Sequence, residues 1–159
     1  MSAKQAPAVE REIRIAARPD VVFGYFTDPV KMMRWKSISA VLDPRPGGIF
    51  YVNVTGSEIA RGEYLEVTPF SRIIFTWGWE GEGSPIPPGT STVEVNFILD
   101  GKGTLVRLVH RDLPMGADAQ HAEGWDHFLP RLAIAAADGD PGPDPWASAA
   151  GMTAGGSVG

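Results

Sequence analysis

The chain has 159 residues and a formal net charge of −5, with 43% apolar and 21% charged residues, values typical of one ordinary globular domain. The acidic balance argues against a nucleic-acid partner, because phosphate binding requires a basic surface. The absence of cysteine excludes disulfides, thiolate metal ligands and cysteine nucleophiles. No stretch approaches the roughly 20 apolar residues of a membrane span or the apolar segment of a secretory signal. We therefore expect a cytoplasmic protein without a membrane partner.

The first part of the chain is expected to form a strand followed by two short helices. Residues 1–8 show no periodic pattern and are expected to be flexible. Apolar and polar residues alternate over residues 9–16, which predicts a half-buried strand. Apolar residues at helical spacing over 22–26 predict a short helix that stops at Asp28-Pro29. A second short helix is predicted over 29–35, with the proline in its first turn.

The middle of the chain, residues 38–112, changes to a two-residue period that predicts five or six further strands. Short segments rich in Gly and Pro separate these strands, so neighbouring strands should pair antiparallel. Asp100-Gly101, between two alternating runs, is the clearest hairpin signal. The longer Gly- and Pro-rich segment 80–90 is expected to be a mobile flap or a loop at the sheet edge.

After Pro114 the helical period returns and predicts one long helix over residues 117–137 with an apolar stripe facing the sheet. Residues 138–159 are rich in Gly, Pro and Ala and are expected to be a flexible tail, within which Trp146 can dock back onto the body. The predicted organisation is therefore a single α+β domain over residues 9–137.

Several local motifs occur in an order that resembles one known family. They are Asp28-Pro29 with Trp35, the run from Gly47 to Phe50, the run from Gly62 to Pro69, the run from Arg72 to Trp77, the run from Gly103 to His110, and the run from His121 to Leu129. Together they are similar to domains of the activator of Hsp90 ATPase homologue 1-like family, a branch of the START-like (SRPBCC) superfamily. The resemblance covers about residues 9 to 137.

The resemblance implies a helix-grip fold, also called START-like or Bet v 1-like. In this fold a curved antiparallel sheet, here of about six to seven strands, wraps around a long C-terminal helix, and two short helices follow the first strand. It also implies an internal cavity. The superfamily includes lipid and hormone carriers as well as polyketide cyclases, so the resemblance implies no single reaction.

Alternation places large apolar side chains on one face of several strands and of the long helix, and we predict a ligand pocket between them. The predicted ligand-binding residues are Trp35, Phe50, Val52, Phe75, Trp77, Trp79, Phe97, His110, His121, Trp125, Phe128 and Leu129. The alternative for each aromatic residue is an ordinary place in a packed core.

Two histidines are the candidate catalytic residues. His110 continues the inward face of its strand, and His121 lies one turn before Trp125 on the helix, so the two imidazoles are expected to approach one another near the cavity mouth. Such a pair could act as proton donor and acceptor or hold a ligand carbonyl. The alternative is that each imidazole is satisfied by the backbone or a carboxylate. Two histidines without a third ligand predict no metal site, and no cofactor motif is present.

The sequence therefore predicts a protein that binds a small hydrophobic or aromatic molecule. One alternative is an enzyme similar to a polyketide cyclase or dehydratase, with His110 or His121 as acid and base. Another is an interaction module, either a co-chaperone of an Hsp90-like ATPase or a homodimer that pairs through an exposed strand. Both a monomer and a homodimer remain open at this point.

Overall fold

The computed structural model describes residues 6–147 of the chain. Its elements, in chain order, are β1 (Val9–Ile15), α1 (Pro19–Thr27), α2 (Pro29–Met32), β2 (Ser39–Leu42), β3 (Ile49–Asn53), β4 (Ile59–Thr68), β5 (Arg72–Trp77), β6 (Ser91–Asp100), β7 (Gly103–Arg111) and α3 (Asp118–Ala136). The expected order of a strand, two short helices, a run of strands and a long last helix is confirmed.

All seven strands belong to one antiparallel sheet with the order β1-β7-β6-β5-β4-β3-β2. Strands β2 to β7 pair with their neighbours in sequence, as short connections require. The first strand then pairs with the last, so that Val9 lies opposite His110. The predicted hairpin at Asp100-Gly101 is confirmed, because Asp100 lies opposite Gly103 and Gly101 has the positive φ of 63° that this tight turn requires.

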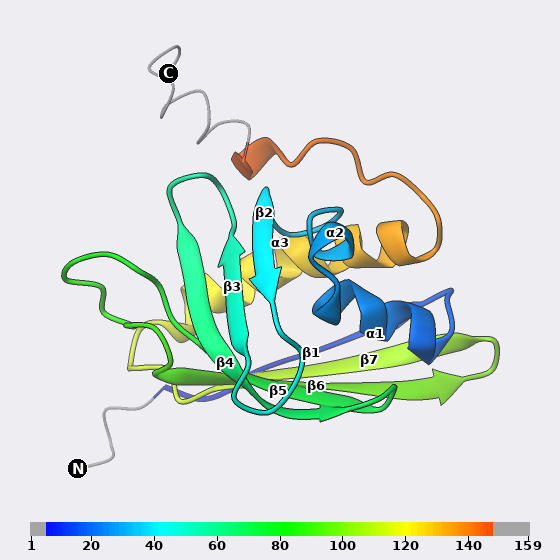
Figure 1. Ribbon diagram of the computed structural model, residues 1–159, viewed down its shortest axis with the longest axis horizontal. Helices are drawn as coiled ribbons and strands as arrows, with labels where there is room; N and C mark the ends of the chain where they lie inside the picture. The colour runs from blue at the N-terminus through cyan, green and yellow to red at the C-terminus, as the bar shows by residue number, and fades with distance from the viewer. Residues whose placement is uncertain (1–5, 148–159) are drawn as a thin grey trace.

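The sheet curves around α3. In Figure 1, β2, β3 and β4 stand at a steep angle to the layer formed by β1, β6 and β7, and α3 lies on the concave side between them. The helices α1 and α2 cover one end of this concave side, where the Tyr25 hydroxyl donates a hydrogen bond of 3.0 Å to the Ala135 carbonyl of α3. The predicted helix-grip architecture is therefore confirmed.

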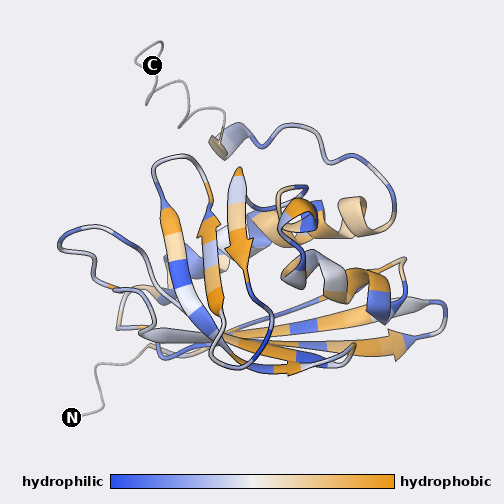
Figure 2. Ribbon diagram, viewed as in Figure 1, coloured by the Kyte–Doolittle hydropathy of each residue, from blue (hydrophilic) through white to orange (hydrophobic). Residues whose placement is uncertain are grey.

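The core fills the space between the sheet and α3. Every second residue is buried along β5 and along β6 as far as Phe97. The buried residues of α3 include Trp125, Phe128, Leu129 and Leu132. Figure 2 shows the corresponding alternation of hydrophobic and hydrophilic residues along the strands. Within residues 6–147, the structure contains no helix of the length and apolar character that crossing a membrane would require.

The first part of the segment after α3 lies against the body of the protein. Residues 138–147, which were expected to belong to a flexible tail, contact the body of the protein: Arg131 donates hydrogen bonds to the carbonyls of Pro141 and Gly142, at 3.3 and 2.9 Å. The physical reason is that a guanidinium on α3 offers several donors to backbone carbonyls that would otherwise be solvated. Residues 148–159 of the expected tail lie outside the described residues.

Trp146 docks back onto α3, as the sequence analysis considered. Its ring stacks on His127 with a centroid separation of 3.7 Å, and His127 in turn contacts Asp144 at 2.7 Å. At the other end of the chain, within the segment 1–8 that the sequence predicts to be flexible, the Ala6 amide donates to the Leu113 carbonyl at 2.8 Å. Residues 1–5 lie outside the described part of the chain.

Candidate functional site

The interior has a closely packed end and an open end. At the packed end the rings of Phe50 and Phe75 stack with their centroids 4.0 Å apart, and Phe26 of α1 packs edge-on against Phe97 at 5.5 Å. Several predicted ligand-binding residues belong to this packed interior instead of the open end. They are Phe50, Val52, Phe75, Phe97 and Leu129. Their side chains are held by neighbouring protein atoms, because α1 and α2 close this end of the sheet.

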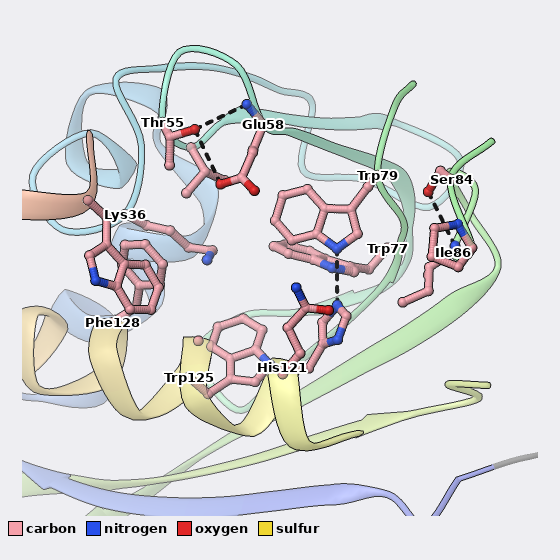
Figure 3. A pocket seen from close by; sticks show the side chains of 15 residues that line it. Lys36, Thr55, Glu58, Trp77, Trp79, Ser84, Ile86, His121, Trp125 and Phe128 are labelled. Carbon is pink, nitrogen blue, oxygen red and sulfur yellow. Dashed lines mark hydrogen bonds between the residues drawn. The ribbon is translucent and has the colours of Figure 1, made fainter. Parts of the chain in front are cut away.

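The open end holds a pocket of about 250 Å³. Its walls come from the end of β5 and the loop after it, the turn between β3 and β4, and one face of α3. Lys36, in the turn after α2, completes the wall (Figure 3). Among the predicted ligand-binding residues, this pocket brings together Trp77, Trp79, His121, Trp125 and Phe128. Trp35 lies instead on the wall of a second hollow, between the turn after α2 and the segment 140–147.

A glycine in α3 leaves room for the pocket. Gly124 stands between His121 and Trp125 on the helix and lines the pocket. A Cβ placed on Gly124 would meet no heavy atom within 4 Å. The helix therefore presents bare backbone at a point where any larger side chain would extend into the cavity.

The loop between β5 and β6, expected as a flap or an edge loop, forms one wall of the pocket. Its base is held by a hydrogen bond of 2.7 Å from the Trp79 amide to the Ile86 carbonyl. Ile86 is only 2% exposed. The loop also packs on Gly78, where a Cβ would lie 1.9 Å from the Pro87 carbonyl oxygen. Only glycine fits this close approach, so any larger residue at position 78 would displace the loop from the end of β5.

His110 is fully buried and has a partner at each ring nitrogen. Its Nδ1 accepts a hydrogen bond of 3.1 Å from the indole N–H of Trp125, so the proton is on Nε2, which lies 2.9 Å from the Ser91 hydroxyl. That hydroxyl donates in turn to the Trp77 carbonyl at 2.8 Å. Burial, followed by the proximity of His121 and Lys36, lowers the pKa of His110 to about 3. This imidazole is neutral, and it does not line the pocket.

His121 lines the pocket but is engaged in a similar way. Its Nε2 accepts a hydrogen bond of 3.0 Å from the indole N–H of Trp79, and its Nδ1 lies 2.8 Å from the Ala117 carbonyl, to which it donates. Burial lowers the pKa of His121, although the hydrogen bond to Ala117 opposes this shift. The rings of His110 and His121 are 5.0 Å apart. The two histidines thus approach one another as neutral acceptors for two tryptophans.

Lys36 supplies the cation of the pocket. Its side chain is buried, and Nζ lies 5.0 Å from the ring centre of Trp77, 4.7 Å from that of Trp125 and 3.9 Å from that of Phe128. Burial lowers the pKa of Lys36 to about 7, while the charge of Asp144 opposes the shift. At the exposed mouth the Glu58 carboxylate accepts a hydrogen bond of 3.4 Å from the Thr55 hydroxyl.

The comparisons with known proteins identify the family. The family described as "Activator of Hsp90 ATPase homolog 1-like protein" matches residues 16–137. The chain belongs to this family. No curated protein matches the chain. Among residues 6–147 of this family member, no cluster of three or more imidazole or carboxylate side chains could hold a metal ion.

Solved structures of relatives share the fold. An AHSA1-like protein from Rhizobium etli is 48% identical over 88% of each chain, with a TM-score of 0.70. An HSP90 activator from Plasmodium falciparum is 25% identical over 82% of this chain and 96% of its own, with a TM-score of 0.67. CalU16 from Micromonospora echinospora is 25% identical over 94% of this chain and 87% of its own, with a TM-score of 0.66.

Several pocket residues of this AHSA1-like protein were not among the predicted ligand-binding residues. They include Lys36, Thr55, Glu58, Ile86, Gly124 and Trp146. Most lie in turns or after the regular elements, where no period indicates which way a side chain points. Lys36 follows Trp35 in the turn after α2, and a lysine is ordinarily exposed, so its burial carries no local signal. Gly124 had a signal, since a glycine inside a helix often has a packing or functional reason.

Proposed function

We propose that this AHSA1-like protein binds a small, mainly aromatic molecule in the pocket between β5, the loop after it and α3. The observation that carries the proposal is an open cavity of about 250 Å³ walled by Trp77, Trp79, Trp125 and Phe128, next to an interior that is otherwise closely packed. Flat aromatic walls favour flat ligands, since offset and edge-on ring contacts add to the burial of apolar area. Ligand pockets of this kind are mostly apolar, with a few polar groups.

The size of the cavity restricts the ligand to one or two rings. Pockets for drug-sized molecules usually begin near 300 Å³, and this one is slightly smaller. A long lipid chain or a multi-ring polyketide would need additional space that the packed end, with Phe50 stacked on Phe75, does not provide.

The hydrogen bonds of the two histidines favour ligand binding over acid–base catalysis as the function of the pocket. A general base needs a nitrogen within hydrogen-bond reach of the substrate proton, and in both His110 and His121 each ring nitrogen already has a protein partner. An Hsp90-directed activity would rest on the name of a relative that is 25% identical, so ligand binding is the function that we put forward.

Gly124 offers a direct test, because a Cβ added to it meets no other heavy atom within 4 Å. We expect Gly124→Leu to fill the pocket and abolish binding of neutral bicyclic probes such as indole and 2-naphthamide. Gly124→Ala is the matched control, since a methyl group leaves most of the cavity open. Saturation-transfer NMR on both variants and the wild type measures binding. Equal binding by Gly124→Leu and wild type, or no binding by wild type, would contradict the proposal.

A further inference from the structure

Lys36 places an amine in the aromatic part of the pocket. Only 5% of the residue is exposed, and Nζ faces the rings of Trp77, Trp125 and Phe128 (Figure 3). Contacts between an ammonium group and ring faces stabilise the cation. They do not satisfy its three donors, because a ring face is a weak acceptor.

Lys36 Nζ has no hydrogen-bond acceptor within the described residues. No hydrogen bond or ion pair reaches it from any part of residues 6–147, and the charge of Asp144 acts on it without an ion pair. The indole N–H of Trp77 is also buried without a partner, whereas the indoles of Trp35, Trp79 and Trp125 each donate to a protein acceptor.

A buried amine without a hydrogen-bond partner on the wall of a pocket calls for a ligand with acceptor oxygens. Lys36 lines the pocket, whereas the indole N–H of Trp77 is enclosed by protein atoms and is out of reach of a ligand. A carboxylate has two acceptor oxygens and a negative charge, and hydrogen bonds to a charged partner are the stronger kind. An amide or ketone has an acceptor oxygen but brings no negative charge to the buried amine.

We propose that the pocket is a site for a small aromatic acid whose carboxylate accepts hydrogen bonds from Lys36 Nζ. This inference rests on the proposed function and adds the chemical class of the ligand. The Glu58 carboxylate at the exposed mouth favours the orientation in which the acid group lies inside, beside Lys36, because like charges repel. The aromatic body then contacts the ring walls of the pocket.

The proposal predicts a pH dependence for binding. Burial lowers the pKa of Lys36 to about 7, and a bound carboxylate favours the protonated amine, so binding takes up protons above pH 7. The other ionisable groups around Nζ are Glu58, Asp144, His110 and His121. The pKa of each histidine is lowered, so Lys36 is the group that we expect to change charge between pH 7 and 9.

The test compares 2-naphthoate with its uncharged analogue 2-naphthamide by isothermal titration calorimetry. We expect wild type to bind 2-naphthoate at least tenfold more tightly than 2-naphthamide at pH 7. Lys36→Met should remove this preference, whereas Lys102→Met, at an exposed turn position, should keep it.

The outcomes separate this inference from the proposed function. Equal affinity of wild type for the two probes, or an unchanged preference in Lys36→Met, would overturn the acid ligand while leaving an aromatic pocket in place. Failure of both probes to bind would overturn both proposals. Should Lys36→Met not fold, wild type alone decides: the affinity for 2-naphthoate should fall by roughly tenfold for each pH unit above 7, and the affinity for 2-naphthamide should stay constant. A constant affinity for both would contradict the inference.

Discussion

The packed end and the open end of the interior use the same face of one sheet, yet only one of them leaves a cavity. At the packed end, Phe26 and Trp35 from the segment around α1 and α2 fill the space above the sheet. The centres of their rings lie 5.2 Å apart. At the open end the cover is a loop and a helix position without a side chain, Gly124. The difference indicates that a pocket in this fold depends on what covers the sheet.

The two ends also differ in how they treat polar groups. At the open end two indole N–H groups are satisfied by His110 and His121. The indole N–H of Trp77 is buried without a partner, and no hydrogen bond within residues 6–147 reaches the amine of Lys36. Unsatisfied donors reduce stability when they are buried. Buried donors without partners are typical of a binding site, which is less stable by itself because its polar groups are arranged to bind a ligand.

The largest expected effect compares the same truncation at the two ends. Phe75→Ala should lower the free energy of unfolding by about 3–5 kcal/mol, because it removes a ring from a closely packed stack. Phe128→Ala should cost at least about 1 kcal/mol less, because the space it creates joins an existing cavity that water can enter. Urea denaturation of both variants measures the difference. Equal costs would show that the open end is packed as tightly as the core.

Removing the buried amine should stabilise the open end. Lys36→Met is expected to raise the free energy of unfolding by about 1–4 kcal/mol at pH 7. The pKa of Lys36 is lowered from 10.5 to about 7 in the folded protein, so the unfolded chain binds more protons between these values. Wild-type stability therefore rises with pH across this window, and the advantage of the variant should shrink toward pH 10. Denaturation at pH 7, 8.5 and 10 tests this; a constant difference would contradict the burial of a charge.

Replacing His110 tests how the open end contributes to stability at acidic pH. His110→Gln should cost about 1–3 kcal/mol, because Trp125 or Ser91 loses a well-placed partner. The pKa of His110 is lowered from 6.5 to about 3 on folding, so its neutral form stabilises the protein above pH 6.5. Wild-type stability should then fall by up to about 1.4 kcal/mol per unit as the pH drops from 6.5 toward 3. Thermal unfolding across this range should give a shallower slope for the variant, and an identical slope would contradict the assignment.

The smallest effect distinguishes two glycines. Gly124→Ala should stabilise the protein by about 1 kcal/mol, because alanine is the better helix former and its methyl group enters open space. Gly101→Ala should destabilise it by about 1 kcal/mol, because residue 101 has a positive φ of 63°. Differential scanning calorimetry measures both. Destabilisation by Gly124→Ala would mean that the open space at this position is filled in solution.

The sequence by itself determined the elements and their order. The alternation in β5 to β7, the Asp100-Gly101 turn and the helical stripe around Trp125 are local patterns, so their periods predict secondary structure and the buried face directly. The ordered motifs were sufficient to predict the family and the helix-grip fold. They also predicted which aromatic residues point inward, for example Phe50 and Trp77.

Only the tertiary structure decided which inward residues pack and which line a cavity. Phe75 and Trp77 have the same alternation on the same strand, but Phe75 is covered by another ring and Trp77 lies beside the pocket, a difference that depends on distant segments meeting above the sheet. Lys36 is buried because α2 and α3 bring it under three aromatic rings, and no local pattern encodes that meeting. A period reports which face a side chain occupies, whereas the empty volume and the unpartnered donors arise from the packing of elements far apart in the sequence.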